Sequence, residues 1–248
     1  MKKQEPVIEI RNMVAKYGEK TILEDINVDI LPGEITVILG GSGCGKTTLL
    51  KNMLRLYEPA SGSVKFWGEE ILQMDEHAFH EVLKKTGMLF QNGALLNSIS
   101  VYENISIPLE MHTKLSSTII DRMIRIKLSL VGLADAIHML PSELSGGMKK
   151  RAGLARALAM DPYILFCDEP SAGLDPVTSA ALDELILSLK EQLKMTIVIV
   201  THELASIHRI ADKIIFLDEG TMLFYGSLAE AKSAGIPKID NFFEVGKF

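Results

Sequence analysis

The sequence contains no long apolar run and no excess of positive charge, and both absences limit what the chain can do. Its apolar stretches, such as residues 35–39, 163–167 and 196–200, fall well short of the roughly 18 residues that cross a bilayer. The formal net charge of −6 argues against a nucleic-acid-binding surface and against simple electrostatic adhesion to anionic lipid. Any attachment to a membrane is therefore expected to depend on a protein partner.

Cysteine is also scarce, since Cys44 and Cys167 are the only two in 248 residues. A disulfide between them would compete with ligand binding in the two motifs that contain them, so both are predicted to be free thiols in a reducing compartment. Residues 1–6 lack the apolar segment of a secretory signal, which favours a cytoplasmic protein. The 47% of hydrophobic residues is ample for the core of one large domain or two small ones.

Strand-like and helix-like segments alternate along most of the chain. Strands bounded by turn residues are predicted at 7–13, 22–30 and 63–67, and short, apolar, buried strands at 35–39, 86–90, 163–168, 196–201 and 213–217. Buried strands that are separated by helices indicate a parallel α/β core.

The middle of the chain has a different pattern, because residues 101–159 carry helical periodicity without an intervening strand. Helices are predicted at 101–110, 116–131 and 146–159. We interpret this stretch, about 92–160, as a helical subdomain inserted into a domain that spans residues 1–235.

The last residues, 236–248, form a tail after a short predicted helix at 228–233. The tail contains Phe242, Phe243 and Phe248, which is unusual for a disordered end. These aromatic residues predict that the tail packs on this chain or on a partner.

The most informative motif is a glycine-rich loop between a predicted strand and a predicted helix. It consists of Gly40, Gly41, Ser42, Gly43, Cys44, Gly45, Lys46, Thr47 and Thr48. Glycines allow successive backbone N–H groups to surround phosphate oxygens, and the start of a helix adds positive potential. Lys46 is predicted to reach the β- and γ-phosphates, and the Thr47 hydroxyl to bind Mg²⁺. The loop therefore predicts binding of a nucleoside triphosphate.

A second motif is an apolar strand, residues 163–167, that ends in the carboxylates Asp168 and Glu169. Most such pairs merely begin a surface loop, but a buried strand delivers its last side chains to the edge of a parallel sheet where ligands bind. Asp168 is predicted to hold Mg²⁺, directly or through water, and Glu169 to polarise an attacking water. In a chain that already has the glycine-rich loop, this pair predicts hydrolysis of the triphosphate.

A third motif, LSGGM at residues 144–148, begins a predicted helix. The bare N–H groups of Gly146 and Gly147, the Ser145 hydroxyl and the helix N-terminus together form another anion site. With this motif the sequence resembles the nucleotide-binding subunits of ATP-binding cassette (ABC) transporters, and the likeness covers residues 7 to about 233.

The resemblance implies an α/β fold of the P-loop NTPase class, an ABC nucleotide-binding domain. Such a domain has a RecA-like mixed-sheet core, an antiparallel β subdomain and an inserted helical subdomain. In this family the phosphate loop and the signature helix of one chain are too far apart to bind one nucleotide. The resemblance therefore also implies a head-to-tail homodimer with two ATP molecules at the interface.

Four further positions match the family one at a time. Gln91 matches the glutamine that joins the core to the helical lobe and senses Mg²⁺ and the water. His202 matches the histidine that contacts the γ-phosphate and supports the glutamate. Asp175 matches a loop that crosses the dimer interface, and Tyr17 matches the aromatic residue that stacks on adenine. Taken alone, Gln91 and His202 would be interpreted as ordinary solvated loop residues and Tyr17 as a structural residue.

One position departs from most of the family, which has glutamine where this chain has Met148. A thioether donates no hydrogen bond, so a polar contact of that glutamine is missing. The same substitution is familiar in the ATPases of Mla- and Mce-type lipid-transport systems, which this chain resembles. That resemblance implies an integral membrane permease subunit, an Mce-type lipid-binding subunit, and a peripheral position on the cytoplasmic face of the inner membrane.

Other functions are compatible with parts of the pattern. An ATPase subunit of a small-solute importer is an alternative, because the cargo contacts other subunits in such systems. A soluble mechanical ABC ATPase usually has a long coiled coil, a second domain or basic arms, which this acidic chain does not show. A scaffold that binds ATP without cleaving it is disfavoured by the presence of both Glu169 and His202.

Overall fold

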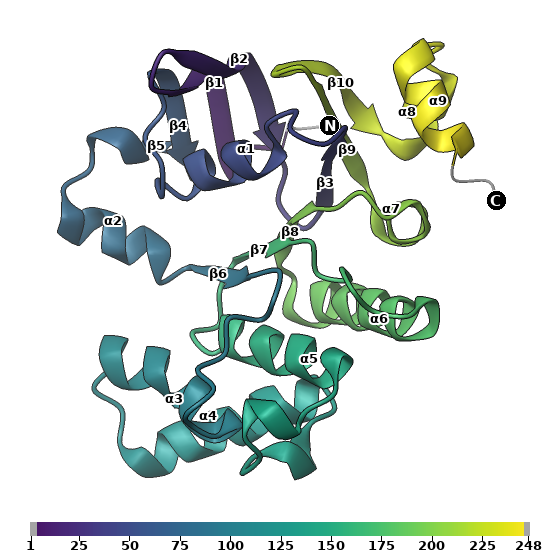
Figure 1. Cartoon of the computed structure of the whole chain (residues 1–248). Coiled ribbons are helices and arrows are strands. Elements are labelled where there is room, and N and C mark those ends of the chain that lie inside the picture. The colour runs from purple at the N-terminus through teal and green to yellow at the C-terminus, as the bar shows by residue number, and fades with distance from the viewer. Residues whose placement is uncertain (1–3, 246–248) are drawn as a thin grey trace. The chain divides into compact units, whose positions relative to one another are not determined.

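Buried strands form the frame of the computed structural model, which describes residues 4–245. The chain divides into two units (Figure 1). The described part of unit 1 comprises residues 4–82 and 196–245, and unit 2 comprises residues 83–195. Unit 2 is thus an insertion into unit 1 along the sequence.

Unit 1 contains two sheets. Its strands are β1 (Ile8–Tyr17), β2 (Lys20–Ile30), β3 (Ile35–Gly40), β4 (Ser61–Phe66), β5 (Glu69–Glu70), β8 (Thr196–Val200), β9 (Lys213–Asp218) and β10 (Thr221–Ser227). Its helices are α1 (Lys46–Met53), α2 (Glu76–Leu83), which runs to the unit boundary, α7 (Leu204–Ile210), α8 (Leu228–Ser233) and α9 (Pro237–Val245), with a 3-10 turn at Ile71–Gln73. The strand orders are β2-β1-β4-β5 and β10-β9-β3-β8.

The first sheet is antiparallel, and its most extensive strand pairing joins β1 to the edge strand β2. Inward-facing residues such as Ile8, Ile10 and Ile26 are buried, which is typical of a sheet with one face on a core. The sequence pattern predicts that the first strand ends at residue 13, but β1 continues to Tyr17. Register shifts near Asn12, whose φ is 49°, interrupt the alternation, so the period-2 pattern stops before the strand does.

The second sheet is mixed, because β3 pairs in parallel with β8 and β9 while β10 pairs antiparallel with β9. All six residues of β3 are buried, as are all five residues of β8. Parallel strands that are covered on both faces consist of consecutive apolar residues. The sequence therefore predicts these strands well. Helix α1 contacts strands of both sheets, β1, β2, β3 and β8. The antiparallel subdomain and the mixed core of the predicted fold class are therefore both present.

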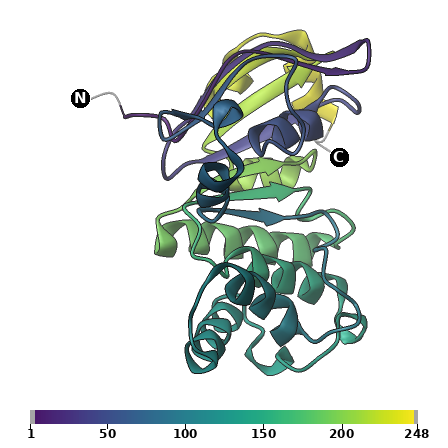
Figure 2. The same cartoon turned by 90° about the vertical axis from the view of Figure 1, so that its left-hand side faces the viewer.

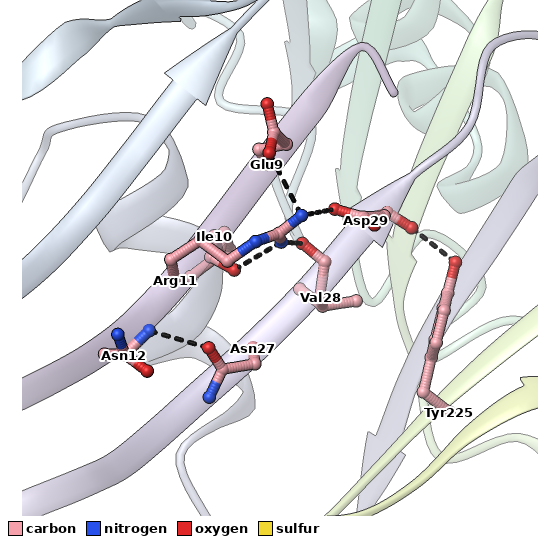
Figure 3. Close-up of polar contacts among 8 residues, drawn as sticks. All are labelled: Glu9, Ile10, Arg11, Asn12, Asn27, Val28, Asp29 and Tyr225. Atoms are coloured by element: carbon pink, nitrogen blue, oxygen red, sulfur yellow. Dashed lines mark hydrogen bonds and ion pairs between the residues drawn. The ribbon is translucent and has the colours of Figure 1, made fainter. Parts of the chain in front are cut away.

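A polar cluster around Arg11 links β1, β2 and β10 of unit 1 (Figure 3). The Arg11 guanidinium forms ion pairs with Glu9, at 3.0 Å, and with Asp29, at 2.6 Å. The Tyr225 hydroxyl donates a hydrogen bond to the backbone oxygen of Asp29. Burial, together with the carboxylates of Glu34 and Asp29, raises the pKa of Tyr225 to about 12, so this hydroxyl stays protonated and can donate.

The predicted tail forms a helix, α9, that packs within unit 1. Ile239 and Phe243 are buried. The Phe242 ring meets Phe216 of β9 with ring centroids 5.5 Å apart, and the Phe243 ring lies 5.6 Å from that of His208. The expected packing is thus found on this chain, whereas Phe248 lies outside the described residues.

Unit 2 combines a pair of parallel strands with four helices. Its elements are β6 (Thr86–Leu89), α3 (Val101–His112), α4 (Ser117–Leu130), α5 (Gly146–Ala157), β7 (Ile164–Asp168) and α6 (Pro176–Leu193), with 3-10 turns at Ala134–Ala136 and Pro141–Glu143. Helices α3, α4 and α5 contact one another, and α5 also contacts β6. Figure 2 shows these three helices gathered on one side of the strand pair.

Side-chain caps explain where α3 and α5 of unit 2 begin. Ser100 and Glu103 form a capping box at the start of α3, with the Glu103 carboxylate accepting the Ser100 N–H at 2.7 Å. The Ser145 hydroxyl accepts the N–H of Met148 at 3.3 Å and caps α5. The three helices predicted between residues 101 and 159 therefore exist, with ends that differ from the predicted ones by zero to two residues.

Candidate functional site

The predicted site residues are distributed over both units. Unit 1 carries the glycine-rich loop, Tyr17 and His202, and unit 2 carries Gln91, Ser145, Gly146, Gly147, Asp168, Glu169 and Asp175. Both predicted free cysteines are free and buried, and burial raises the pKa of the Cys167 thiol.

The glycine-rich loop leads from β3 directly into α1. Gly45 caps the helix with a φ of 106° and provides no side chain, and the first turn of α1 contains no acidic residue. The first N–H groups of a helix have no partner within the helix, and their partial positive charge attracts anions. Because no side chain competes for these N–H groups at α1, they suit the oxygens of a phosphate group.

Lys46 extends over this loop. Its Nζ donates hydrogen bonds to the backbone oxygens of Gly40, at 2.9 Å, and Gly41, at 2.8 Å. The ammonium group is therefore already held by the loop that would contact a phosphate. The neighbouring Thr47 is exposed, whereas Thr48 is buried, so only the first of the two hydroxyls is open to solvent.

Gly40 has no room for a side chain. A Cβ at this position would lie 2.0 Å from the backbone oxygen of Leu217, and its φ of 142° is strained for other residues. We expect Gly40→Ala to lower the free energy of unfolding by about 2 kcal/mol or more. Gly41→Ala is the matched control, because a Cβ there meets nothing within 4 Å. Chemical denaturation of both variants checks this, and equal stabilities would contradict it.

His202 lies at the same edge of the mixed sheet as the glycine-rich loop. In the β3–β8 pair Ile38 is opposite Val200, so Gly40 and His202 each follow the paired residues by two positions. The N–H of Thr201 donates to the backbone oxygen of Ile38 at 3.3 Å, which continues the pairing beyond the strand. The imidazole of His202 is exposed. This arrangement suits contact with a ligand that is bound by the loop.

Tyr17 has an aromatic neighbour that the sequence pattern did not identify. The Tyr17 and Tyr57 rings form an edge-to-face pair with centroids 4.4 Å apart, and Tyr17 is 40% exposed. Tyr57 follows α1, far from Tyr17 in sequence, and no local motif marks it. A partly exposed aromatic pair offers a surface on which a planar base can stack.

In unit 2, the register of the strands places Gln91 and Glu169 at the same end of the β6–β7 pair. β6 and β7 are parallel, with Leu89 opposite Cys167, so Gln91 and Glu169 each follow the paired residues by two positions. Asp168 is the last residue of β7. The backbone of Glu169 has a φ of 47°, a left-handed conformation that non-glycine residues rarely adopt and that is often found at functional sites.

Lys150 of α5, near this end of the strand pair, is a residue that sequence reasoning missed. It is buried, and its Nζ donates hydrogen bonds to the backbone oxygens of Gln91 and of Glu169, the latter at 3.2 Å. The sequence contains one signal for this role, because Lys150 lies four residues before the apolar Leu154 and therefore on the buried face of α5. A buried ammonium group needs polar partners, so its position on that face pointed to such contacts.

The glycines of the signature motif also have a packing role. A Cβ at Gly147 would lie 2.6 Å from the Cγ2 of Thr178 in α6, and one at Gly146 would lie 3.5 Å from Leu174. Ser145 remains exposed although its hydroxyl caps α5, so the O–H can still donate to another acceptor. Met148 is half-buried.

Asp175 caps the N-terminus of α6, a role that the sequence does not predict from the resemblance alone. Its carboxylate accepts the N–H groups of Val177, at 3.1 Å, and Thr178, at 3.0 Å, and the Thr178 hydroxyl at 2.5 Å. The hydrogen bonds from Thr178 and Val177 lower the pKa of this carboxyl below its usual value. The ionised cap therefore stabilises the fold above the unfolded-state pKa, and this contribution is lost as the pH falls through the lower folded-state pKa.

We expect Asp175→Ala to lower the midpoint of thermal unfolding at neutral pH, with a difference from wild type that shrinks below about pH 4. Thermal unfolding followed by circular dichroism over this pH range measures the difference. Glu184→Ala, at an exposed position of the same helix, is the control and should show no such trend. A difference between Asp175→Ala and wild type that is constant with pH would contradict the expectation.

The residues present fit a bound Mg²⁺ ion. No group of three or more His, Cys, Asp or Glu that could hold a metal occurs among residues 4–245. Mg²⁺ commonly keeps several waters and uses one or two protein oxygen ligands together with substrate phosphates. The exposed Thr47 hydroxyl in unit 1 and the strand-end Asp168 in unit 2 are oxygen ligands of that kind.

The fold and these strand-end residues define a P-loop nucleoside triphosphatase. A family model described as ABC transporter matches residues 23–172, which is more than half of the chain. The chain belongs to the ABC transporter family, as an ATP-hydrolysing subunit.

Three known proteins illustrate this similarity. The intermembrane phospholipid transport system ATP-binding protein MlaF of Haemophilus influenzae is 41% identical over 206 residues, which cover 83% of this chain and 78% of that protein. The probable ribonucleotide transport ATP-binding protein mkl of Mycobacterium leprae is 39% identical over 95% of this chain and 68% of its own length. A solved dimeric ATP-binding cassette in a post-hydrolysis state, bound to ADP and Pi, is 28% identical with a TM-score of 0.80, covering 89% of this chain and 98% of that one.

Proposed function

We propose that two copies of this chain bind two ATP molecules between them and that hydrolysis powers the transport of phospholipid. The similarity to the phospholipid transport ATP-binding protein, at 41% identity over most of both chains, is the observation that carries the proposed cargo. The similarity to a dimeric cassette bound to ADP and Pi supports the homodimer. In this dimer, Ser145, Gly146 and Gly147 of one copy face the nucleotide on the glycine-rich loop of the other.

The remaining site residues divide the reaction between them. Lys46 binds the β- and γ-phosphates, and Tyr17 stacks on adenine. Thr47, Asp168 and Gln91 would each offer an oxygen ligand to Mg²⁺, which would neutralise phosphate charge. Glu169 accepts a proton from the attacking water, and His202 contacts the γ-phosphate. Asp175 contributes to the dimer interface in addition to capping α6.

A transport role requires partners that this chain does not supply. Among residues 4–245, no helix is both long enough and apolar enough to cross a membrane. The similarity to the ATP-binding protein of a phospholipid transport system supports the inference of an integral membrane permease, which holds the chain on the cytoplasmic face of the inner membrane, and of an Mce-type lipid-binding subunit. Motion of the dimer on ATP binding and hydrolysis would pass to the permease.

A small-solute importer is the second candidate, because a relative with 39% identity is named a probable ribonucleotide transport protein. Met148 favours the lipid system, since methionine at this position is the departure from the family pattern that lipid-transport ATPases share. The two candidates predict different molecules bound to the complex, phospholipid or a small solute. The chemistry of ATP hydrolysis in this chain is the same for both.

The test is to tag the chain in its native host, extract membranes in mild detergent, and identify the proteins and lipids that copurify by mass spectrometry. A mock purification from untagged cells is the control. An integral membrane subunit together with phospholipid in excess of the control would support the proposal. A solute-binding protein without lipid would favour the importer, and purely soluble partners would contradict a transport role.

A further inference from the structure

Helix α5 is attached to the segment after β6 by two cationic side chains. The Lys150 ammonium group donates a hydrogen bond to the backbone oxygen of Gln91. One turn and a half further along the helix, the Arg156 guanidinium donates to the backbone oxygens of Gly93, at 3.0 Å, and Ala94, at 2.7 Å. Three carbonyl groups of this four-residue segment, at positions 91, 93 and 94, are therefore bound to one helix, and the partners are charged donors, which form strong hydrogen bonds.

Close backbone contact leaves little room for the segment to move relative to the helix. A Cβ at Gly153 of α5 would lie 2.9 Å from the Cα of Gly93, and one at Gly87 of β6 would lie 2.4 Å from the backbone oxygen of Ala157. Only glycine allows backbones to approach in this way. The start of the segment, which contains Gln91, is consequently expected to follow any movement of α5.

Lys150 also reaches the second strand end. Its ammonium group donates to the backbone oxygen of Glu169 at 3.2 Å, and this oxygen also accepts the N–H of Ala172 at 3.2 Å. Glu169 has a left-handed backbone conformation that neighbouring contacts must hold in place. A single buried ammonium group thus connects the backbones of Gln91 and Glu169 to the helix that begins after Ser145.

We propose that Lys150 is a positioning residue for ATP hydrolysis. It sets the spacing between Gln91 and Glu169 and links both residues to the signature helix, so that a nucleotide contact at Ser145 changes their placement. The role rests on the proposed function, because it acts through the residues assigned to Mg²⁺ and water. Lys150 does not itself touch the nucleotide in this assignment.

The first test compares Lys150→Met, which keeps the length of the side chain but removes the donors, with Lys149→Met on the same helix. Lys149 is half-buried and its side chain makes no hydrogen bond among the described residues. We expect Lys150→Met to speed amide hydrogen exchange about fivefold or more at residues 91–94, 169, 171 and 172 of the full chain. Exchange that is unchanged, or raised equally in Lys149→Met, would overturn the inference whether or not the chain hydrolyses ATP.

The second test measures turnover and affinity separately. We expect Lys150→Met to lower kcat about tenfold or more, to leave the Kd for a fluorescent ATP analogue within about twofold, and Lys150→Arg to restore part of the loss. A kcat within about twofold of wild type would overturn the positioning role. So would a parallel loss of affinity and thermal stability that Lys150→Arg does not repair. An inactive wild-type chain would instead contradict the proposed function on which this role rests.

Discussion

Replacing Glu169 by glutamine is expected to lower ATP turnover by about 100-fold or more while leaving ATP affinity within about twofold. The amide has nearly the shape of the carboxylate but cannot accept a proton from water. The contacts assigned to the phosphates come from other residues, above all Lys46 of the glycine-rich loop, and remain in place. Steady-state phosphate release and equilibrium binding of a fluorescent ATP analogue measure the two quantities.

The same variant tests the proposed dimer. If hydrolysis releases the two copies, Glu169→Gln with ATP should elute from a sizing column as a dimer under conditions where the wild type returns to monomer. Glu184→Gln makes the same chemical change at an exposed position of α6 and should behave like wild type. Unchanged hydrolysis in Glu169→Gln would remove Glu169 from the reaction and leave the phosphate-binding assignments intact.

Replacing Lys46 by alanine is expected to weaken ATP binding by about 100-fold or more. The substitution removes the only side-chain cation of the glycine-rich loop at residues 40–48 and its two hydrogen bonds, to the backbone oxygens of Gly40 and Gly41. Equilibrium binding of a fluorescent ATP analogue measures the loss. Hydrolysis should fall with affinity, because the nucleotide is no longer held.

Lys51→Ala is the matched control for this variant. Lys51 is an exposed lysine in the last turn of α1, so its substitution removes the same charge from the same helix. Thermal unfolding of both variants separates a lost phosphate contact from a disordered loop. Full retention of ATP affinity in Lys46→Ala would count against the assignment of the loop as the phosphate site.

Much of the site could be predicted because it depends on neighbouring residues. The glycine-rich loop requires a fixed order of glycine, lysine and threonine between a strand and a helix, and the structure places those elements at Ile35–Gly40 and Lys46–Met53. The buried strands were equally clear, since strands that are covered on both faces are continuously apolar. The family model and the relatives confirm the family and the fold class that these motifs indicated.

The elements that sequence reasoning did not predict are those with weak local signals. Helices α2 and α9 have eight and nine residues, and helices of this length obtain most of their stability from tertiary packing. Strand β10 is only half-buried along most of its length, so its apolar pattern is faint. The long helix α6 is the exception, because Asp175 and Pro176 form a clear helix-start signal that the resemblance to the family relates to the dimer interface instead.

The sequence by itself determined the family and the ATPase activity, and it predicts the residues that a phosphate would meet, because these follow from short motifs. Only the tertiary structure decided that Tyr57 lies against Tyr17 and that Lys150 bonds to the backbone of Gln91 and Glu169. Lys150 and Gln91 are 59 positions apart. Their contact depends on the register of the parallel strands β6 and β7 and on the close packing of α5 that glycines allow. No local sequence pattern encodes that combination.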